Sequence, residues 1–270
     1  MQKQTSKKTY IYNANAIGVA GQITHPFNEI VPVQAASALP PSGGVGSIRV
    51  EGFRHRDILS FGSAYAEVVG TEPEDGVYET LSVSVVEKFN LLDVVTCERI
   101  VARLTSRFPG LAKDGCEPPQ EVTVVPIGSR FEGLRIGNHF FERLELAPDY
   151  FCVPERASWT GLLKAAEYDR DGGLSVLTLP GANGDPVPLP TVEQRATLLG
   201  FCIAVRDPKP GAELGHPVRI NVPQFGTVHL GEFFCGPTSR SLTMLRVELG
   251  CSVGGSANAA AVTGGGRPYP

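Results

Sequence analysis

Apolar and polar residues alternate with a period of two along most of this chain, and the pattern is clearest between residues 218 and 253. There, two alternating runs flank the segment 235–240, which contains a glycine and a proline. Successive side chains of a strand point to opposite faces of a sheet, so this period indicates β-strands. Because Gly and Pro favour turns, the two runs are predicted to form a β-hairpin.

One register of this hairpin keeps side chains of one kind on each face. It pairs Leu230 with Leu245 and Val228 with Val247. On the other face the expected cross-strand pairs are His229 with Arg246, Thr227 with Glu248, and Phe233 with Leu242. A slip of one residue would exchange the two faces, so we expect this register. A shorter run, residues 218–222, is predicted as a third strand that ends before Pro223.

The same period predicts further strands before the hairpin. They are expected at residues 9–23, 30–39, 45–53, 58–69, 78–86, 122–125, 128–136, 139–146 and 201–205. Small residues dominate 13–21, which permits another sheet to approach closely. Residues 91–108 fit both a helix and a strand, and their β-branched content favours a strand.

One helix is predicted, at residues 155–168. Pro154 precedes it, and apolar residues beginning with Trp159 follow helical spacing. The fold class is therefore mainly β: an antiparallel β-sandwich or related multi-sheet domain with one short α-helix. The 31 glycines and 22 prolines among 270 residues agree with many strands joined by turns.

The predicted domain organisation is a single large β-rich domain over residues 1–253. A possible internal boundary lies in the Gly- and Pro-containing segment 109–120. Residues 254–270 are rich in Gly and Ala and are expected to form a C-terminal tail, disordered unless it packs on its own chain or on a neighbour.

Charge and hydropathy limit the partners. The net charge of −4 argues against nucleic acid, which requires a basic surface. No run of 18 apolar residues predicts a transmembrane segment. The first residues do not resemble a secretory signal peptide, so a cytoplasmic location is the default expectation, with surface association by a non-classical route as the alternative.

The six cysteines do not form a C-x-x-C pair, which argues against a zinc ribbon or a thioredoxin-type site. We interpret them mostly as reduced core residues. The alternative is intermolecular disulfides in an extracellular assembly, for which Cys116 and Cys251 are the expected exposed thiols.

No catalytic, cofactor-binding or metal-binding residues are predicted, because no nucleophile elbow, P-loop, zinc or dinucleotide motif occurs. The cluster 54–57 (Arg-His-Arg-Asp) could bind an anion, but a solvated turn is the simpler interpretation. Asp169 begins a sequence similar to a calcium loop, yet Pro180 stands where the loop requires Glu.

A polar sheet face is the remaining candidate site. His229, Arg246 and Glu248 lie on one face of the predicted hairpin. They could form a polar site, but the solvated face of an antiparallel sheet is the favoured interpretation, since no second His or Cys is placed to complete a site.

Several strand segments resemble β-rich bacterial surface proteins of the choice-of-anchor type. The resemblance rests on residues 83–85 and 92–100, on the segment 128–138 (GSRFEGLRIGN), and on 226–232 (GTVHLGE). It covers about a quarter of the chain and implies an all-β, non-enzymatic role at a cell surface. The chain departs from the pattern in its expected lack of a signal peptide and of a C-terminal anchor.

The functional hypothesis is a structural protein that self-associates through its β-sheets and terminal segments, as a homo-oligomer or larger assembly. Gly254, Gly255 and Tyr269 mark the expected assembly segment. The first alternative is a β-domain that binds a small ligand or glycan, which predicts that Tyr150, Phe151 and Trp159 line a groove. The second is an enzyme with a distributed site.

Overall fold

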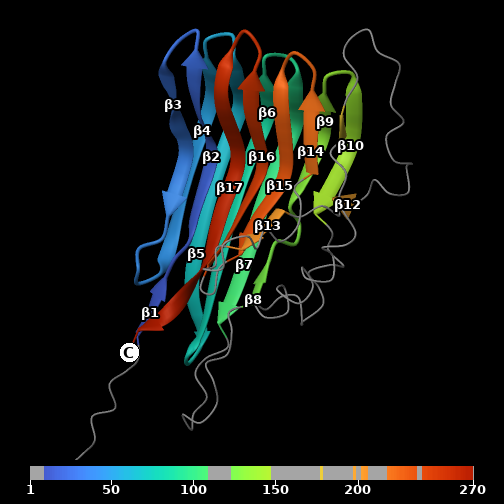
Figure 1. The fold of residues 1–270 in the computed structure, drawn as a ribbon. Coiled ribbons are helices and arrows are strands. Elements are labelled where there is room, and N and C mark those ends of the chain that lie inside the picture. Colours follow the sequence, from blue (N-terminus) through green and yellow to red (C-terminus); the bar gives the residue numbers. More distant parts are fainter. Residues whose placement is uncertain are drawn as a thin grey trace, which may run out of the picture.

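In the computed structural model, two β-sheets lie face to face and confirm the predicted sandwich (Figure 1). The structure describes residues 9–108, 123–146, 177–178, 197–198, 202–205, 218–235 and 239–269. The strands are β1 (Thr9–Tyr12), β2 (Asn15–His25), β3 (Glu29–Ala38), β4 (Gly44–His55), β5 (Leu59–Glu74), β6 (Val77–Leu91), β7 (Val95–Phe108), β8 (Thr123–Val125), β9 (Arg130–Ile136), β10 (His139–Leu146), β11 (Leu177–Thr178), β12 (Thr197–Leu198), β13 (Cys202–Val205), β14 (Val218–Val222), β15 (Gly226–Cys235), β16 (Ser239–Gly250) and β17 (Gly254–Tyr269).

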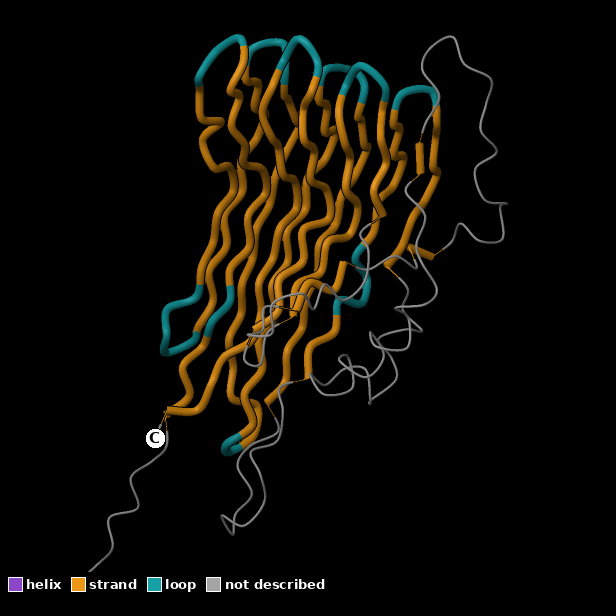
Figure 2. Tube along the Cα trace, viewed as in Figure 1, coloured by secondary structure: helices purple, strands orange, loops and turns teal. Residues whose placement is uncertain are grey.

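The nine-stranded sheet has the order β11-β14-β15-β16-β17-β2-β3, with β1 beside β17 and β13 beside β15. The eight-stranded sheet has the order β12-β10-β9-β7-β6-β5-β4, with β8 beside β7. Neighbouring strands are antiparallel except where the short strands β11, β12 and β13 pair. The described turns gather at the two ends of the long strands (Figure 2).

The predicted hairpin and its register are confirmed. Strands β15 and β16 pair Leu230 with Leu245, Val228 with Val247 and His229 with Arg246, and the other predicted pairs also form. The four apolar residues of the first two pairs are buried. The third strand, β14, pairs with β15 over residues 218–222, as expected from its alternating apolar residues.

The ambiguous segment 91–108 is a strand: β6 ends at Leu91 and β7 covers Val95–Phe108. Its β-branched residues fit a pleated, half-buried surface better than a helix. Other predictions lie outside the described residues: the helix at 155–168, the boundary at 109–120, the loop beginning at Asp169, and the aromatic residues Tyr150, Phe151 and Trp159.

The Gly- and Ala-rich segment 254–270 was predicted as a tail, and this is wrong for its described part. Gly254–Tyr269 is strand β17, which lies inside the nine-stranded sheet and pairs with β16 on one side and β2 on the other. Its inward residues are small and buried, including Ala257 and Ala259. The small side chains of this segment thus reflect the close packing of the two sheets. From the sequence alone, such a composition is equally compatible with a disordered tail.

Small residues allow the two sheets to approach closely, as predicted for the N-terminal strand. The Ser82 hydroxyl of β6 donates a hydrogen bond to the Thr263 carbonyl at 2.7 Å, and Ser84 donates to the Ile17 carbonyl at 2.8 Å. A Cβ added to Gly18 would lie 3.0 Å from the Ala64 Cβ. Hydroxyl groups therefore reach the backbone of the opposite sheet and satisfy buried polar groups there.

A line of irregular residues, which we call the crease, crosses each sheet perpendicular to its strands. In the eight-stranded sheet every second strand carries a residue of positive φ on this line: Gly52 on β4 (63°), Lys88 on β6 (53°) and Gly133 on β9 (63°). In the nine-stranded sheet the equivalent residues are Ala35 (50°), Gly231 (66°) and Ala260 (52°). The strands keep the same pairing register on both sides of Gly52, Lys88, Gly133 and Gly231, so the crease is a local change of backbone conformation without an extra residue in any one strand.

The crease changes which residues face the core. In β5, Phe61 and Ala64 both point inward and are buried, although two residues separate them instead of one. In β15, Leu230 and Phe233 both belong to the hydrophobic core although Gly231 and Glu232 separate them, so the expected placement of Phe233 and Leu242 on the face of His229 is wrong. A simple period of two therefore assigns the wrong face to residues beyond the crease.

Candidate functional site

The two sheets end on the same side in long edge strands. Among the described residues, β3 pairs only with β2 and β4 only with β5. Each edge exposes apolar side chains: Ile30 (74% exposed) and Val33 on β3, Val45 (69%) and Ile48 on β4. An unpaired edge presents backbone N–H and C=O groups to a further strand. Pro32 removes one donor from β3, so β4 offers the more continuous edge.

On the opposite side of the eight-stranded sheet, β10 is the last long strand, and the two-residue strand β12 lies beside it. Strand β12 pairs with β10 only at Glu145 and Leu146. Within the described part of the chain, residues 139–144 therefore have a partner strand on one side only. Phe140 on this edge is 58% exposed. Among the described residues, both ends of the eight-stranded sheet therefore include backbone that has no partner strand on its outer side.

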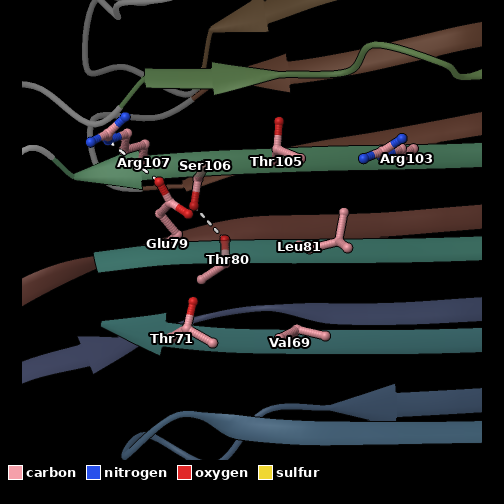
Figure 3. Close-up of a pocket in the computed structure, with 9 residues that line it drawn as sticks. All are labelled: Val69, Thr71, Glu79, Thr80, Leu81, Arg103, Thr105, Ser106 and Arg107. Atoms are coloured by element: carbon pink, nitrogen blue, oxygen red, sulfur yellow. Dashed lines mark hydrogen bonds and ion pairs between the residues drawn. The ribbon is translucent and has the colours of Figure 1, made fainter. Parts of the chain in front are cut away.

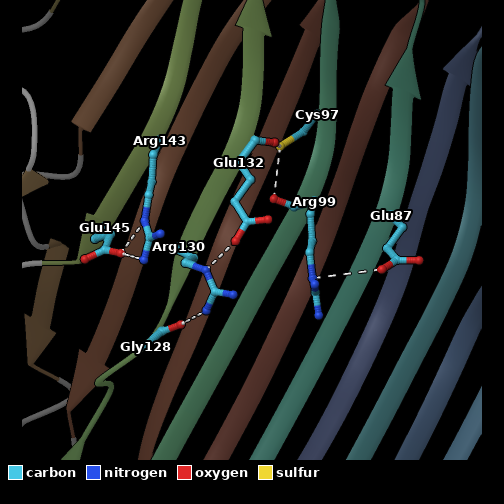
Figure 4. Close-up of polar contacts among 8 residues, drawn as sticks. All are labelled: Glu87, Cys97, Arg99, Gly128, Arg130, Glu132, Arg143 and Glu145. Carbon is cyan, nitrogen blue, oxygen red and sulfur yellow. Dashed lines mark hydrogen bonds and ion pairs between the residues drawn. The ribbon is translucent and has the colours of Figure 1, made fainter.

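Alternating charges cross the outer face of this sheet beside the crease (Figure 4). Arg143 lies opposite Glu132, Glu132 opposite Arg99, and Arg99 opposite Glu87. The Arg130 Nε donates to Glu132 at 2.6 Å, which lowers the pKa of that carboxyl group. Opposite charges facing each other stabilise neighbouring strands.

The charge row extends to both edges. Toward β4, the Ser63 hydroxyl donates to Glu87 at 2.8 Å, and Ser63 lies opposite Glu51 on β4. Glu51 forms an ion pair with Arg49, and at the other edge Arg143 forms one with Glu145. The two edges therefore carry complementary charges: a carboxylate ends the row on β4 and a guanidinium ends it on β10.

The predicted polar sheet face is brought together by the structure. His229 lies opposite Arg246, the His229 Nε2 is 3.8 Å from the Glu248 carboxylate, and Arg246 forms an ion pair with Glu248. The interpretation as a solvated face is wrong for His229, whose side chain is only 7% exposed. The alternation of polar and apolar residues predicts on which face of the sheet a side chain lies. It does not predict whether that face is buried or exposed to solvent.

Glu232 belongs to the same cluster and was missed by the sequence analysis. The Arg246 Nε and Nη2 both donate to its carboxylate at 2.6 Å, and these hydrogen bonds raise the pKa of Arg246. Strict alternation would place Glu232 on the opposite face from His229, but Gly231 at the crease reverses the alternation. An isolated glycine within a strand is the signal that could have indicated this irregular backbone.

A shallow hollow of about 400 Å³ lies on the outer face of β5, β6 and β7 (Figure 3). Most of its lining residues are polar or charged, including Thr71, Arg103 and Thr105. The Arg107 Nε lies 3.4 Å from the Glu79 carboxylate, and Thr80 and Ser106 are hydrogen bonded to each other. Much of its polar capacity is therefore used within the protein.

The cluster 54–57 is occupied by ion pairs within the chain. Arg54 pairs with Asp57, Arg56 pairs with Glu29, and the His55 Nε2 lies 3.3 Å from Glu29. These contacts favour the solvated-turn interpretation over an anion site. In the described ranges, no group of three or more His, Cys, Asp or Glu side chains is arranged to hold a metal ion.

Cys97 is expected to be chemically inert in the folded protein. Burial is the main cause that raises the pKa of its thiol, to about 12, and its Sγ donates to the carbonyl groups of Arg99 and Glu132. Since the thiolate is the reactive form, iodoacetamide at pH 8 should leave Cys97 unmodified until the protein unfolds. Peptide mapping by mass spectrometry with and without urea tests this. Rapid labelling of Cys97 in native buffer would contradict it.

Comparison with known proteins identifies a family for this chain. The model of the family described as domain of unknown function (DUF8256) matches residues 10–174, more than half of the 270-residue chain. No curated protein and no solved structure matches the chain. Within the described residues there is no helix whose length and hydropathy would allow it to cross a membrane.

Proposed function

This chain belongs to the DUF8256 family, and we propose that its function is structural: it self-associates by joining the edges of its β-sheets. The observation that carries the proposal is the pair of adjacent open edges, β3 and β4, which expose aliphatic side chains along unpaired backbone. Natural proteins usually protect such edges, because a second chain can pair with them.

Edge pairing suits this architecture energetically. The two sheets end side by side, so one partner can extend both layers at once and continue the core between them. Exposed Ile48, which lies opposite buried Ala66, would then become buried, and each buried aliphatic side chain contributes roughly 1.5–3 kcal/mol. The charged residues of β4 would supply specificity more than affinity.

The proposal assigns assembly to the edges and not to Gly254 and Gly255. The backbone of these residues already pairs with β16 and β2 of the same chain. Tyr269 lies at the end of β17, opposite Thr9 of β1, and is 55% exposed. The proposed self-association therefore takes place through the edges of the β-sheets. The C-terminal segment contributes to it only as a strand of the fold that carries these edges.

Light scattering coupled to size exclusion should give a mass above the 28.8 kDa of one chain, rising with concentration. Ile48→Lys is expected to shift the protein toward the monomer, because a charge on the edge opposes strand pairing. Ile127→Lys is the matched control, since Ile127 is similarly exposed (43% against 40%) but lies outside the strands. A wild-type protein that stays monomeric at the highest attainable concentration would refute the proposed function.

A further inference from the structure

We infer that edge β4 of one copy pairs with edge β10 of a second copy, so that the protein assembles head to tail. This inference rests on the proposed self-association and specifies its geometry. It follows from strand direction, from the position of the crease and from the residues that the two edges present.

Strand direction permits this pairing. The strands β4, β5, β6, β7, β9 and β10 are each antiparallel to the next. Strands β4 and β10 therefore run in opposite directions. A second copy placed beside the first in the same orientation sets its β4 antiparallel to β10, as the sheet already does between its own strands.

The crease defines the register. It passes between β9 and β10 at Gly133 and Glu142, because the flanking pairs are Leu134 with Phe141 and Glu132 with Arg143. On β4 it lies at Gly52. Every second strand carries a positive-φ residue on this line, and β10 does not. Placing Gly52 of the second copy opposite Glu142 continues the crease and its alternation.

In this register, the residues of β10 that face the core lie opposite the residues of β4 that face the core in the second copy. Leu144 lies opposite Val50 of the second copy, and Phe141 opposite Phe53 of the second copy. All four side chains are buried or pack against the hydrophobic core in the single chain. Aliphatic and aromatic cross-strand pairs of this kind stabilise antiparallel sheets.

The same register matches charges on the outer face. Arg143 lies opposite Glu51 of the second copy, which extends the alternation of Glu87, Arg99, Glu132 and Arg143 by one more opposite charge. Exposed Phe140 lies opposite Arg54 of the second copy, a pairing that allows a cation–π contact. The charge pairs and the crease therefore support the same register independently.

The pairing spans residues 139–144 of β10 and 50–55 of β4, and it requires β12 to move aside, because residues 44–49 of the second copy continue along β10 into the place of β12. Strand β12 pairs with Glu145 and Leu146, the next two residues of β10. With this two-residue strand moved aside, the register adds Glu145 opposite Arg49 and Leu146 opposite Ile48 of the second copy. Both additional pairs are again complementary.

A two-fold dimer that pairs β4 with itself fits less well. Val50 opposite its own equivalent puts inward-facing Phe53 opposite outward-facing Ser47, because the crease reverses the alternation at Gly52. The self-pairing that sets Glu51 opposite Gly52 keeps inward side chains opposite inward ones, but it places Arg49 opposite Arg54, and like charges directly opposite each other destabilise the pair. A head-to-tail contact leaves one free edge at each end, so it produces a ring or a filament.

Charge reversal tests the assignment. Glu51→Arg alone places two guanidinium groups at the contact, and Arg143→Glu alone places two carboxylates there. Each variant is expected to weaken assembly by about tenfold or more. Mixing the two single variants should restore assembly, since every contact between unlike copies is again complementary, and the double variant should assemble by itself. Arg103→Glu on the central strand β7 is the control and should assemble as the wild type does.

The outcomes separate the two proposals. A monomeric wild type refutes the proposed function. A wild type that assembles, with E51R disruptive and R143E without effect, overturns the head-to-tail assignment and indicates β4 self-pairing. Failure of the mixed variants to recover, when circular dichroism shows that both are folded, also overturns it. Negative-stain images of the restored mixture should show rings or filaments, and discrete dimers would contradict the assignment.

Discussion

Replacing Phe131 with alanine is expected to lower the free energy of unfolding by about 3–5 kcal/mol, one of the largest effects of any single substitution in this chain. Phe131 is fully buried on β9, between Ile100 of β7 and Leu144 of β10. Truncation removes the transfer free energy of the ring and leaves a cavity that the two neighbouring strands cannot fill without losing their own pairing.

Urea denaturation followed by circular dichroism measures this effect, at a fixed protein concentration because self-association would itself stabilise the folded state. Phe27→Ala is the matched control. Phe27 is 39% exposed in a turn, where its ring contacts the Arg56 guanidinium, so its loss should cost below about 1 kcal/mol. Equal losses for the two variants would contradict the packing described for β9.

Glu232→Ala is expected to cost about 3 kcal/mol of stability, because it leaves a partly buried guanidinium without its bidentate carboxylate. The Glu232 side chain is 5% exposed, and Arg246 donates to both of its oxygens. The carboxylate of Glu248 pairs with the same guanidinium but is 53% exposed. Glu248→Ala should therefore cost about 1 kcal/mol or less, as surface ion pairs do.

The free energies of unfolding of the Glu232→Ala and Glu248→Ala variants are measured by thermal and urea denaturation. The two carboxylates pair with the same guanidinium and differ in burial, so the comparison isolates the effect of burial. A similar loss for both would mean that solvent reaches Glu232 as readily as Glu248. A large loss for E232A alone would establish that the cluster of His229, Glu232 and Arg246 is a structural support on the outer face of the sheet.

Much of the fold follows from local pattern. Alternation across residues 226–250 predicts the hairpin and its register, because inward and outward faces of a sheet have different surroundings and a slip would exchange them. The strand at 95–108 follows from its β-branched residues. Of the candidate site, the sequence places His229, Arg246 and Glu248 on one face.

Two features could not be read from local pattern. Glu232 joins His229 only because the backbone at Gly231 adopts a positive φ, which inverts the alternation. Residues 254–269 form a central strand only because another sheet is close enough to require glycine and alanine between them. In isolation the same composition is typical of a flexible tail.

The sequence by itself determined the sandwich, since a period of two can bury one face of each strand only by packing sheet against sheet. The tertiary structure decided where the sheets end and how their irregular residues line up. Gly52 and Gly133 stand 81 positions apart, and only strand order places them on one crease. The same order puts Glu51 and Arg143 at opposite edges of one charge row, because cross-strand neighbours are selected by hydrogen bonding and packing over the whole sheet.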